Sequence, residues 1–445
     1  MPSTHPIPAV IGSGLSGLLI SHALSKAGID HVLIGGPPST GSPRLGESLG
    51  IPATVHLATE FPDLAQFYGS KLYARVLLGE VKGGFRLDTW RTTATDLSLR
   101  YWNKRGPDYL FHLDRTEFDA VLYTKVTASR HCLPLEDRVA AIDVVPGTDR
   151  IGALDLENSG ELAVSHVFDA TGHVRLLARR LAIPRRMLGV TQNVVFAHYF
   201  KAENAGAQGG DAARPPRIVS DLDWRDGTTI LRLYHEIDGF DGMAWCIPLG
   251  DKVSVGVSTP ANGPALSEDV LLQRTQTRFA RHHIHYGDDY PVRSRLGKAK
   301  MEFYTHARAC GSNWLLAAAA HHQIWWTAST GLDLAVTAAG AAVPFIRKPA
   351  QTACRYQAGM NRVEHVQRLW AFGAEHRYGT ATDHGMQEFE NELTWLIAAR
   401  FAHTIHLERE DWISAIGTRV ASAMLSSDLS QYAPATGRSI RIETK

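Results

Sequence analysis

The sequence predicts an α/β protein built on a Rossmann-like dinucleotide-binding unit, followed by a mostly β domain and a helical C-terminal region. A β-branched run leads into a G-x-G-x-x-G, an apolar helix follows directly, and a second strand covers residues 31–34. This strand-helix-strand order is the context that a dinucleotide fingerprint requires. Gly12 allows the tight turn, Gly14 lets the backbone approach a pyrophosphate, and Gly17 lets the helix pack on the strand. Ser13 belongs to the same turn, where the helix N-terminus offers N–H groups to phosphates.

Composition sets limits on the function. The chain has 445 residues, 44% of them hydrophobic and 20% charged, which is typical of a soluble protein of two or three domains. A net charge of +1 gives no reason to expect nucleic acid or an anionic membrane as a partner. The four cysteines are scattered, so we expect neither a disulfide framework nor a zinc site. No uncharged apolar run is long enough to span a bilayer, and we expect a cytoplasmic protein.

Histidine is frequent, with 21 copies, and it forms two clusters. Residues 282–285 and 321–322 hold these clusters, but neither has the spacing of a known ligand pair. A metal site and ordinary buried or exposed histidines are the two interpretations. We expect no metal site.

The rest of the chain divides into blocks. An amphipathic helix with Asp114 as its N-cap is predicted at residues 112–122. Three strands at 139–145, 151–156 and 162–168 then lead to an Asp-Ala-Thr-Gly sequence, and a mostly β region covers about 194–257. The alanine-rich final third has helical periodicity.

The order of five motifs resembles a known family, the flavin-dependent halogenase and geranylgeranyl reductase branch of the class A FAD monooxygenases. The resemblance covers about residues 8 to 345, in the order of the family. Its motifs are Gly12-x-Gly14-x-x-Gly17, Arg44-x-Gly46-Glu47-Ser48-Leu49, Asp114-Arg115-x-x-Phe118-Asp119, the run Val167-Phe168-Asp169-Ala170-Thr171-Gly172, and Trp245-x-Ile247-Pro248-Leu249 before Ser254-Val255-Gly256-Val257.

The resemblance implies a flavoprotein of the glutathione-reductase and p-hydroxybenzoate-hydroxylase type. The FAD-binding domain would comprise residues 1–75, 112–180 and 296–348, the substrate domain 76–111 and 181–295, and the helical region 349–445. By the same resemblance the cofactor-contacting residues, besides those of the glycine turn, are Arg44, Glu47, Ser48, Arg115, Asp169, Gly172, Thr330 and Gly331. An exposed Arg44, a helix-surface Arg115 and a plain β-turn at 169–172 are the alternatives.

Two departures from the family pattern concern cofactor binding. The second strand ends in Gly35-Gly36, where relatives carry an acid that hydrogen-bonds the adenosine ribose. A Gly-Asp pair that normally holds the ribityl chain is replaced by Ala318-Ala319, and a following Asp-Pro by Trp325-Trp326. Each lost hydrogen bond weakens binding by roughly 1–3 kcal/mol, so we expect loosely held FAD.

The choice of chemistry depends on two further positions. In the family's halogenases a lysine accepts the hypohalous species, and Lys82 lies near its expected place, although it can equally be an exposed loop lysine. The first tryptophan of the halogenase W-x-W-x-I-P segment is Met243 here, which disfavours halogenation. Hydroxylation of an electron-rich ring through a flavin C4a-hydroperoxide needs a dry cavity and a proton donor. His321 and His322 are candidate donors.

Within the family the chain looks similar to the monooxygenases that hydroxylate a tryptophan residue during tryptophylquinone biogenesis of quinohemoprotein amine dehydrogenase. This resemblance implies a protein or peptide subunit of an amine dehydrogenase as the aromatic substrate. FAD would be reduced by NAD(P)H or by a partner flavin reductase, because no second G-x-G-x-x-G is present. Three functions stay open: an aromatic monooxygenase, a halogenase or prenyl-chain reductase on the same fold, and a flavin-poor relative that binds a polypeptide without catalysis.

Overall fold

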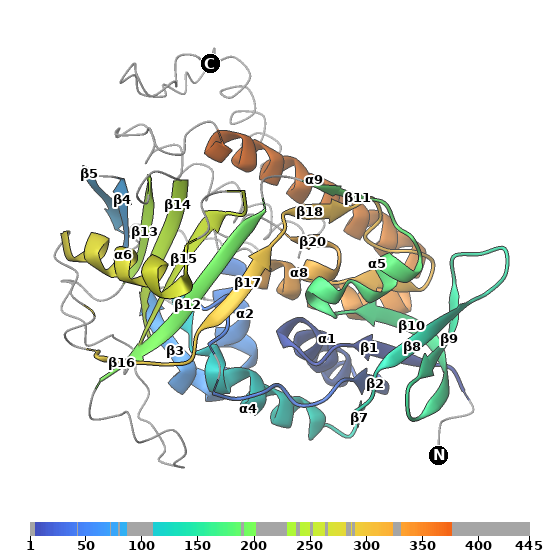
Figure 1. Cartoon of the computed structure of the whole chain (residues 1–445). Coiled ribbons are helices and arrows are strands. Elements are labelled where there is room, and N and C mark those ends of the chain that lie inside the picture. The colour runs from blue at the N-terminus through green and yellow to red at the C-terminus, as the bar shows by residue number, and fades with distance from the viewer. Residues whose placement is uncertain are drawn as a thin grey trace, which may run out of the picture.

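The computed structural model describes most of the first 375 residues, namely 5–41, 43–71, 73–78, 81–86, 110–187, 191–201, 229–236, 241–249, 252–262, 266–281, 286, 290–323 and 331–375. Two sheets lie side by side in this part of the chain, one in each of two units (Figure 1).

The first sheet carries the glycine turn. It has seven strands in the order β7-β2-β1-β10-β9-β8, with β19 paired to β10. β7, β2, β1, β10 and β19 are parallel, whereas β8, β9 and the first half of β10 form an antiparallel meander. The strands predicted at 31–34, 139–145, 151–156 and 162–168 are therefore confirmed. The bounds are β1 Ile7–Ile11, β2 His31–Ile34, β7 Cys132–Leu135, β8 Val139–Val144, β9 Ile151–Leu156, β10 Gly160–Asp169 and β19 Trp314–Leu316.

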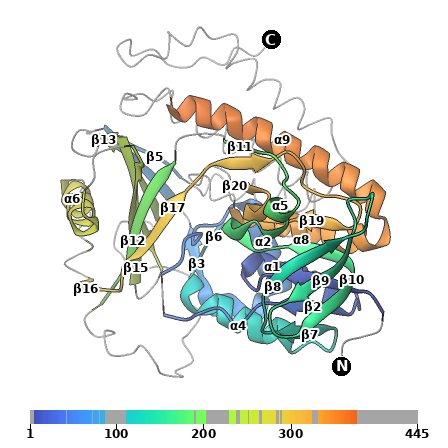
Figure 2. The ribbon, with the colours of Figure 1, turned by 45° about the vertical axis from the view of Figure 1, so that its right-hand side comes forward.

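Helices α1 and α8 pack together on one face of this sheet, with α4 beside α1 (Figures 1 and 2). Apolar side chains such as Leu18, Leu19, Ala335 and Ala338 join them in one buried cluster. The prediction of Asp114 as a helix cap is confirmed, since its carboxylate accepts a hydrogen bond from the Thr116 N–H at 3.2 Å. The helices around this sheet are α1 Leu15–Lys26, α2 Ile51–Glu60, α4 Arg115–Thr127, α5 Leu176–Arg180 and α8 Gly331–Arg347.

The second sheet has eight strands in the order β16-β12-β15-β14-β13-β4-β5, with β17 paired to β12. Because side chains alternate along a strand, Val194 and Phe196 face the first unit, whereas Val195 and Ala197 belong to the cluster that packs under α6. Figure 2 shows α6 on the side of this sheet that faces away from the first unit. The strands that the structure describes within the mostly β region predicted at 194–257 belong to this sheet. The bounds are β4 Tyr73–Leu78, β5 Val81–Arg86, β12 Gln192–Phe200, β13 Thr229–Glu236, β14 Asp241–Pro248, β15 Lys252–Pro260, β16 Val292–Arg293, β17 Gly297–Met301 and α6 Glu268–Arg281.

The remaining described elements are two small sheets, short helices and the long helix α9. β11, β18 and β20 form a small sheet, β3 pairs with β6, and the long helix α9 follows α8. The bounds are η1 Pro62–Phe67, β3 Tyr68–Lys71, β6 Leu110–Leu113, η2 Gly172–Val174, β11 Arg185–Met187, β18 Tyr304–His306, η4 Ala318–Ala320, β20 His322–Gln323 and α9 Pro349–Glu375.

The predicted helix at 112–122 begins later than expected, because Leu110–Leu113 pair with β3 before α4 starts at Arg115. The division into domains stays a prediction. β4, which begins at Tyr73, and β17, at Gly297–Met301, both belong to the eight-stranded sheet rather than to the first one. Helices α8 and α9 agree with the helical periodicity expected of the final third as far as residue 375.

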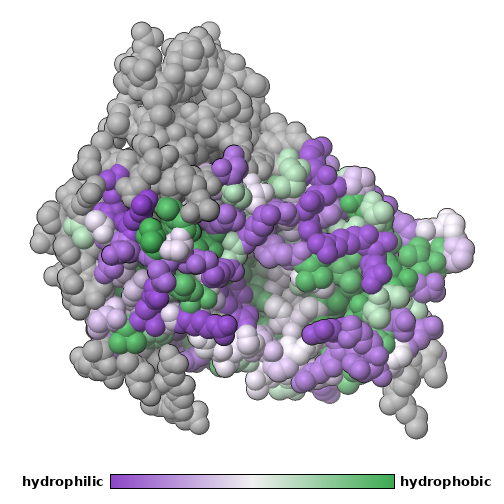
Figure 3. All heavy atoms as spheres, viewed as in Figure 1, coloured by the Kyte–Doolittle hydropathy of each residue, from purple (hydrophilic) through white to green (hydrophobic). Residues whose placement is uncertain are grey.

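The outer surface is mixed in character. On the face seen in Figure 3, hydrophilic residues are interspersed with smaller hydrophobic patches. Among the residues that the structure describes, no helix combines the length and the apolar character needed to cross a bilayer.

Candidate functional site

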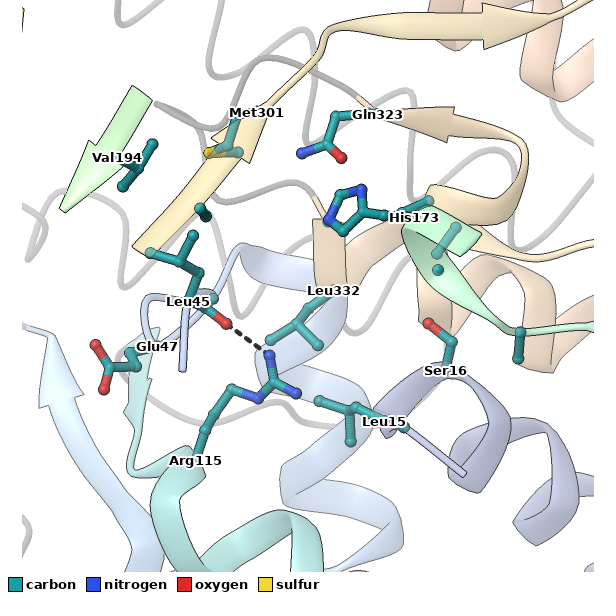
Figure 4. Close-up of a pocket in the computed structure, with 18 of the residues that line it drawn as sticks. Leu15, Ser16, Leu45, Glu47, Arg115, His173, Val194, Met301, Gln323 and Leu332 are labelled. Atoms are coloured by element: carbon teal, nitrogen blue, oxygen red, sulfur yellow. Dashed lines mark hydrogen bonds between the residues drawn. The ribbon is translucent and has the colours of Figure 1, made fainter. Parts of the chain in front are cut away.

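A cavity of about 720 Å³ lies where the two units meet, within the range of roughly 300–1,000 Å³ that small-molecule sites occupy. Figure 4 shows Met301 and Val194 along one side of it, Gln323 and His173 along another, and Leu15 and Ser16 at the far end. Residues of the glycine turn, of the 44–49 loop and of the second sheet all line it. The cavity thus joins most of the motifs that sequence analysis singled out.

One end of the cavity is the glycine turn. Gly12 has a φ of +103°, which favours glycine, and a Cβ on Gly17 would lie 1.8 Å from the Gly12 carbonyl oxygen. Gly14 differs, because a Cβ there would meet nothing within 4 Å and would project into open space. Helix α1 begins after Gly14 with no side-chain cap and no acidic residue in its first turn. Its free N–H groups can therefore receive a phosphate.

The end of β2 shows how the missing acid is accommodated. The Ser13 hydroxyl donates to the Gly36 carbonyl oxygen. A Cβ on Gly35, whose φ is +139°, would lie 2.9 Å from that hydroxyl. A side chain would therefore be strained at Gly35, whereas a Cβ on Gly36 would meet nothing within 4 Å, and Ser13 bridges the turn and the end of β2.

Arg115 projects from the first turn of α4 into the cavity wall (Figure 4). Its Nη1 donates to the Leu45 carbonyl oxygen at 2.6 Å and its Nη2 to Asp119 at 2.6 Å. Burial alone would lower the pKa of Arg115, but the Asp119 carboxylate outweighs it and raises that pKa. Arg44 also binds Asp119, at 3.1 Å, and donates to the Ser39 carbonyl oxygen, so it braces the loop from outside the cavity lining.

A buried hydrogen-bonded pair and a buried ion pair fasten the second sheet to the first unit. Glu47 lines the cavity, and its Oε1 lies 2.6 Å from Nε2 of His198 on β12. Lys252 on β15 lies 2.7 Å from the Asp114 carboxylate. Burial pushes the pKa of Asp114 upward, but the Lys252 ammonium outweighs this, and the net result is a lowered pKa. Sequence analysis offered no reason to select His198, because its partner lies 151 residues away.

Asp169 lies behind the cavity wall rather than in it. Its carboxylate accepts hydrogen bonds from the Thr171 N–H at 2.9 Å, the Thr171 hydroxyl at 2.6 Å and the Leu177 N–H at 2.8 Å. Burial raises its pKa, although these hydrogen bonds act against that rise. Asp169 thereby fixes the turn that presents Thr171, Gly172 and His173 to the cavity.

The segment that replaces the Gly-Asp pair keeps an unusual backbone. Ala318 has a φ of +46°, a conformation that favours glycine, and both Ala318 and Ala319 line the cavity. Ala318 therefore has a backbone conformation that a glycine would adopt readily, and Ala319 carries no acid. Next to this segment His322 and Gln323 also line the cavity.

The two candidate histidines differ in position. His322 lines the cavity, whereas His321 is buried outside it with its Nε2 3.0 Å from the His306 carbonyl oxygen. Burial lowers the pKa of His321 to about 3 and that of His322 well below its usual value. Exchange of a proton near neutral pH, which sequence analysis expected of them, is thus disfavoured for both. A neutral His322 can still donate or accept a hydrogen bond.

The second sheet supplies an apolar wall. Val194, Trp245, Ile247 and Met301 line the cavity, and the indole of Trp245 lies over Gly256 on the neighbouring strand. A wall of this kind keeps bulk water from a reacting group. The retained half of the W-x-W-x-I-P segment is part of this wall.

The structure describes some of the remaining predicted residues and not others. Gly331 begins α8 and lines the cavity, and Ser48 lines it beside Glu47. Lys82 on β5 is paired with Leu77 on β4, so Lys82 belongs to a strand rather than to a loop. The side chain of Lys82, and the residues Thr330, Trp325, Trp326 and 282–285, lie outside the described part. Within that part no three metal-binding side chains gather.

Comparison with known proteins supports the fold. No family model matches the sequence, and no curated protein does. Solved structures, by contrast, match this chain in fold. Flavin-dependent brominase Bmp2 aligns with a TM-score of 0.62 and 16% identity over 95% of this chain and 100% of its own. A mutant of halogenase PltM in complex with FAD aligns with a TM-score of 0.63 and 15% identity over 97% and 94%.

A monooxygenase is among the similar structures as well. The probable FAD-dependent monooxygenase pqsL from Pseudomonas aeruginosa aligns with a TM-score of 0.59 and 16% identity, covering 90% of this chain and 99% of its own. The predicted fold class is therefore confirmed: a Rossmann-like FAD-binding unit with a second β unit, as in flavin-dependent halogenases and monooxygenases.

Proposed function

We propose that the protein is an FAD-dependent monooxygenase that hydroxylates an electron-rich aromatic ring. The observation that carries the proposal is the shared cavity, which runs from the uncapped N-terminus of α1 to the apolar wall of the second sheet. A pyrophosphate fits the first end, and an aromatic ring fits the second. The fold of the similar structures supports the same cofactor.

Each part of the cavity has a task in this proposal. The α1 N-terminus and Arg115 would hold the negative charge of the cofactor, Thr171 and Gly172 would flank it, and Val194 and Trp245 would exclude water. When bound and reduced, FAD supplies the activation of O₂ that oxygen transfer requires. Glu47, oriented by His198, can accept a hydrogen bond from a hydroxyl or ring N–H of the substrate.

Hydroxylation is preferred to halogenation because Met243 stands where halogenases have a tryptophan. The experiment compares products formed from aromatic substrates, with and without bromide, by wild-type protein and Lys82→Ala. Hydroxylation predicts a gain of one oxygen atom, no effect of bromide and little effect of the substitution. Bromine in the product, lost in Lys82→Ala, would instead establish halogenation. A protein that stays colourless in excess FAD would support the polypeptide-binding alternative.

The finer proposal concerns the substrate and the reductant. A tryptophan side chain in a subunit of a quinohemoprotein amine dehydrogenase is the substrate that the sequence resemblance supports. Incubation with a tryptophan-containing subunit and with its Trp-to-Phe variant tests it by mass spectrometry, and oxygen in the Phe variant would refute it. Oxygen consumption with NADH, NADPH or a separate flavin reductase identifies the electron donor.

A further inference from the structure

We propose that His322 and Gln323 form an uncharged hydrogen-bonding subsite for the flavin half of the cofactor, in place of the missing acid at Ala319. This inference rests on the proposed FAD-dependent function. It concerns residues that the family pattern does not assign, because a Gly-Asp pair normally supplies the contact.

The first observation is a set of polar atoms without partners. Both ring nitrogens of His322 have no hydrogen-bond partner within the described part of the chain. Oε1 of Gln323 has none of good geometry there, although the Gln323 side chain interacts with that of His173 beside it. The two residues are only 1% and 8% exposed, and both line the cavity. More than about 90% of buried polar groups in proteins are paired, and an unpaired one is costly. A ligand in the cavity is the partner that the geometry offers.

The second observation is that these side chains are held in place. β20 pairs with β18, His322 opposite Thr305 and Gln323 opposite Tyr304. The Tyr304 hydroxyl also donates to the Ala319 carbonyl oxygen, which joins β18 to the segment with the unusual backbone. A rigid backbone fixes the direction of the unpaired atoms, so little ordering is needed when a ligand binds.

The third observation is the contrast with the neighbouring histidine. His321 is as deeply buried as His322, but its Nε2 has a backbone partner and it does not line the cavity. Of the two, only the residue facing the cavity has both nitrogens unpaired. Nδ1 of His321 is also without a partner, so the contrast between the two histidines lies in the second nitrogen, which is paired in His321 and unpaired in His322.

The chemistry of the unpaired atoms selects the ligand. Burial lowers the pKa of His322, so its ring is neutral at pH 7 and offers one N–H donor and one acceptor. Gln323 Oε1 only accepts. An anion has no donor for Gln323, and an ammonium group has no acceptor for the His322 N–H. A neutral group with adjacent donors and acceptors satisfies both, and the imide edge of the flavin ring and the ribityl hydroxyls are two such groups.

The test is a pair of binding measurements on the apo-protein, with FAD and with ADP, which lacks the flavin half. Gln323→Leu keeps the volume and removes the unpaired oxygen. We expect it to raise the Kd for FAD about three- to tenfold and to leave the Kd for ADP unchanged. The Tm of the apo-protein should stay the same or rise, because a buried unpaired oxygen is removed. His322→Leu should act in the same direction.

Gln192→Leu is the matched control, since Gln192 is a buried glutamine outside the cavity whose Oε1 accepts from Ser258 at 3.1 Å. It should lower the Tm and leave FAD affinity unchanged. An unchanged Kd for FAD in Gln323→Leu, or an equal rise for ADP, would overturn the subsite. Failure of the wild-type protein to bind FAD would instead overturn the proposed function.

Two smaller probes identify the bound group. If Gln323→Leu weakens both riboflavin and lumiflavin, which lacks the ribityl chain, the subsite binds the ring edge. If it weakens riboflavin alone, the subsite binds the ribityl hydroxyls. Unchanged affinity for both probes would contradict the proposal.

Discussion

Glu47 and His198 meet across the boundary between the two units, with Oε1 and Nε2 2.6 Å apart and both side chains buried. Glu47 belongs to the loop that follows β2, and His198 to β12 of the second sheet. The pair therefore helps to fix the apolar wall relative to the end of the cavity that the glycine turn lines, together with the Asp114–Lys252 pair.

Removal of one member of this pair should strongly destabilise the protein. His198→Leu leaves the Glu47 carboxylate buried without its partner, and we expect the free energy of unfolding to fall by about 3–5 kcal/mol. Replacing both residues by leucine should cost less than His198→Leu alone, because no charge then remains buried. Urea unfolding measures all three proteins. His22→Ala, which breaks the less buried contact with Glu60, is the control and should cost about 1 kcal/mol or less. A double variant less stable than His198→Leu would contradict this account.

The glycine turn predicts opposite effects for two neighbouring substitutions. Gly14→Val adds a side chain in open space before α1, so the fold should persist while cofactor binding is abolished. Gly17→Ala places a Cβ 1.8 Å from the Gly12 carbonyl oxygen, so the fold itself should be disrupted. Circular dichroism and FAD titration separate the two effects. Full FAD binding by Gly14→Val would mean that the pyrophosphate does not pass this turn.

The Asp114–Lys252 pair predicts a pH dependence of stability. The Lys252 ammonium lowers the pKa of Asp114 below its unfolded value near 3.8, despite burial. The ionised carboxylate therefore stabilises the folded state above pH 3.8, and this contribution is lost as the pH falls through the folded pKa. The Tm difference between wild type and Asp114→Asn should be largest near neutral pH and should shrink in acid. Asp155→Asn, at an exposed position, is the control and should show little difference at any pH. A constant difference for Asp114→Asn would refute the assignment.

Much of the first unit could be predicted because its signals are local. The glycine spacing, the Asp114 cap and the strands that end at Asp169 each depend on residues within a few positions of one another. The site could be predicted less well, because its contacts join distant segments. Glu47 pairs with His198, Asp114 with Lys252, and the carboxylate of Asp333 in α8 accepts from the Ala53 N–H in α2.

Adjacent residues can also occupy different environments that the sequence does not distinguish. His321 and His322 were equivalent candidates, yet only His322 lines the cavity. The loss of an acid at Gly35-Gly36 is visible in the sequence, whereas the contact of Ser13 with Gly36 depends on the packing of the turn.

The last prediction concerns the indole that closes the apolar wall. Trp245 and Gly256 are paired residues on β14 and β15, and a Cβ on Gly256 would lie 2.1 Å from Cζ2 of the indole. Gly256→Ala must therefore displace the ring, and overpacking of this kind costs about 1–3 kcal/mol. We expect a lower free energy of unfolding and a change in tryptophan emission.

A second background distinguishes the cost of displacing the ring from a general cost of alanine at this position of β15. In a Trp245→Leu background the clashing indole atoms are absent, so the same Gly256→Ala change should cost little. Urea unfolding of the four proteins forms a double-mutant cycle, and the coupling energy should be close to the cost of Gly256→Ala in the wild type. An equal cost in both backgrounds would mean that the strand, and not the indole, requires the glycine. FAD affinity should change little in Gly256→Ala, because the glycine turn proposed to bind the cofactor lies at the other end of the cavity.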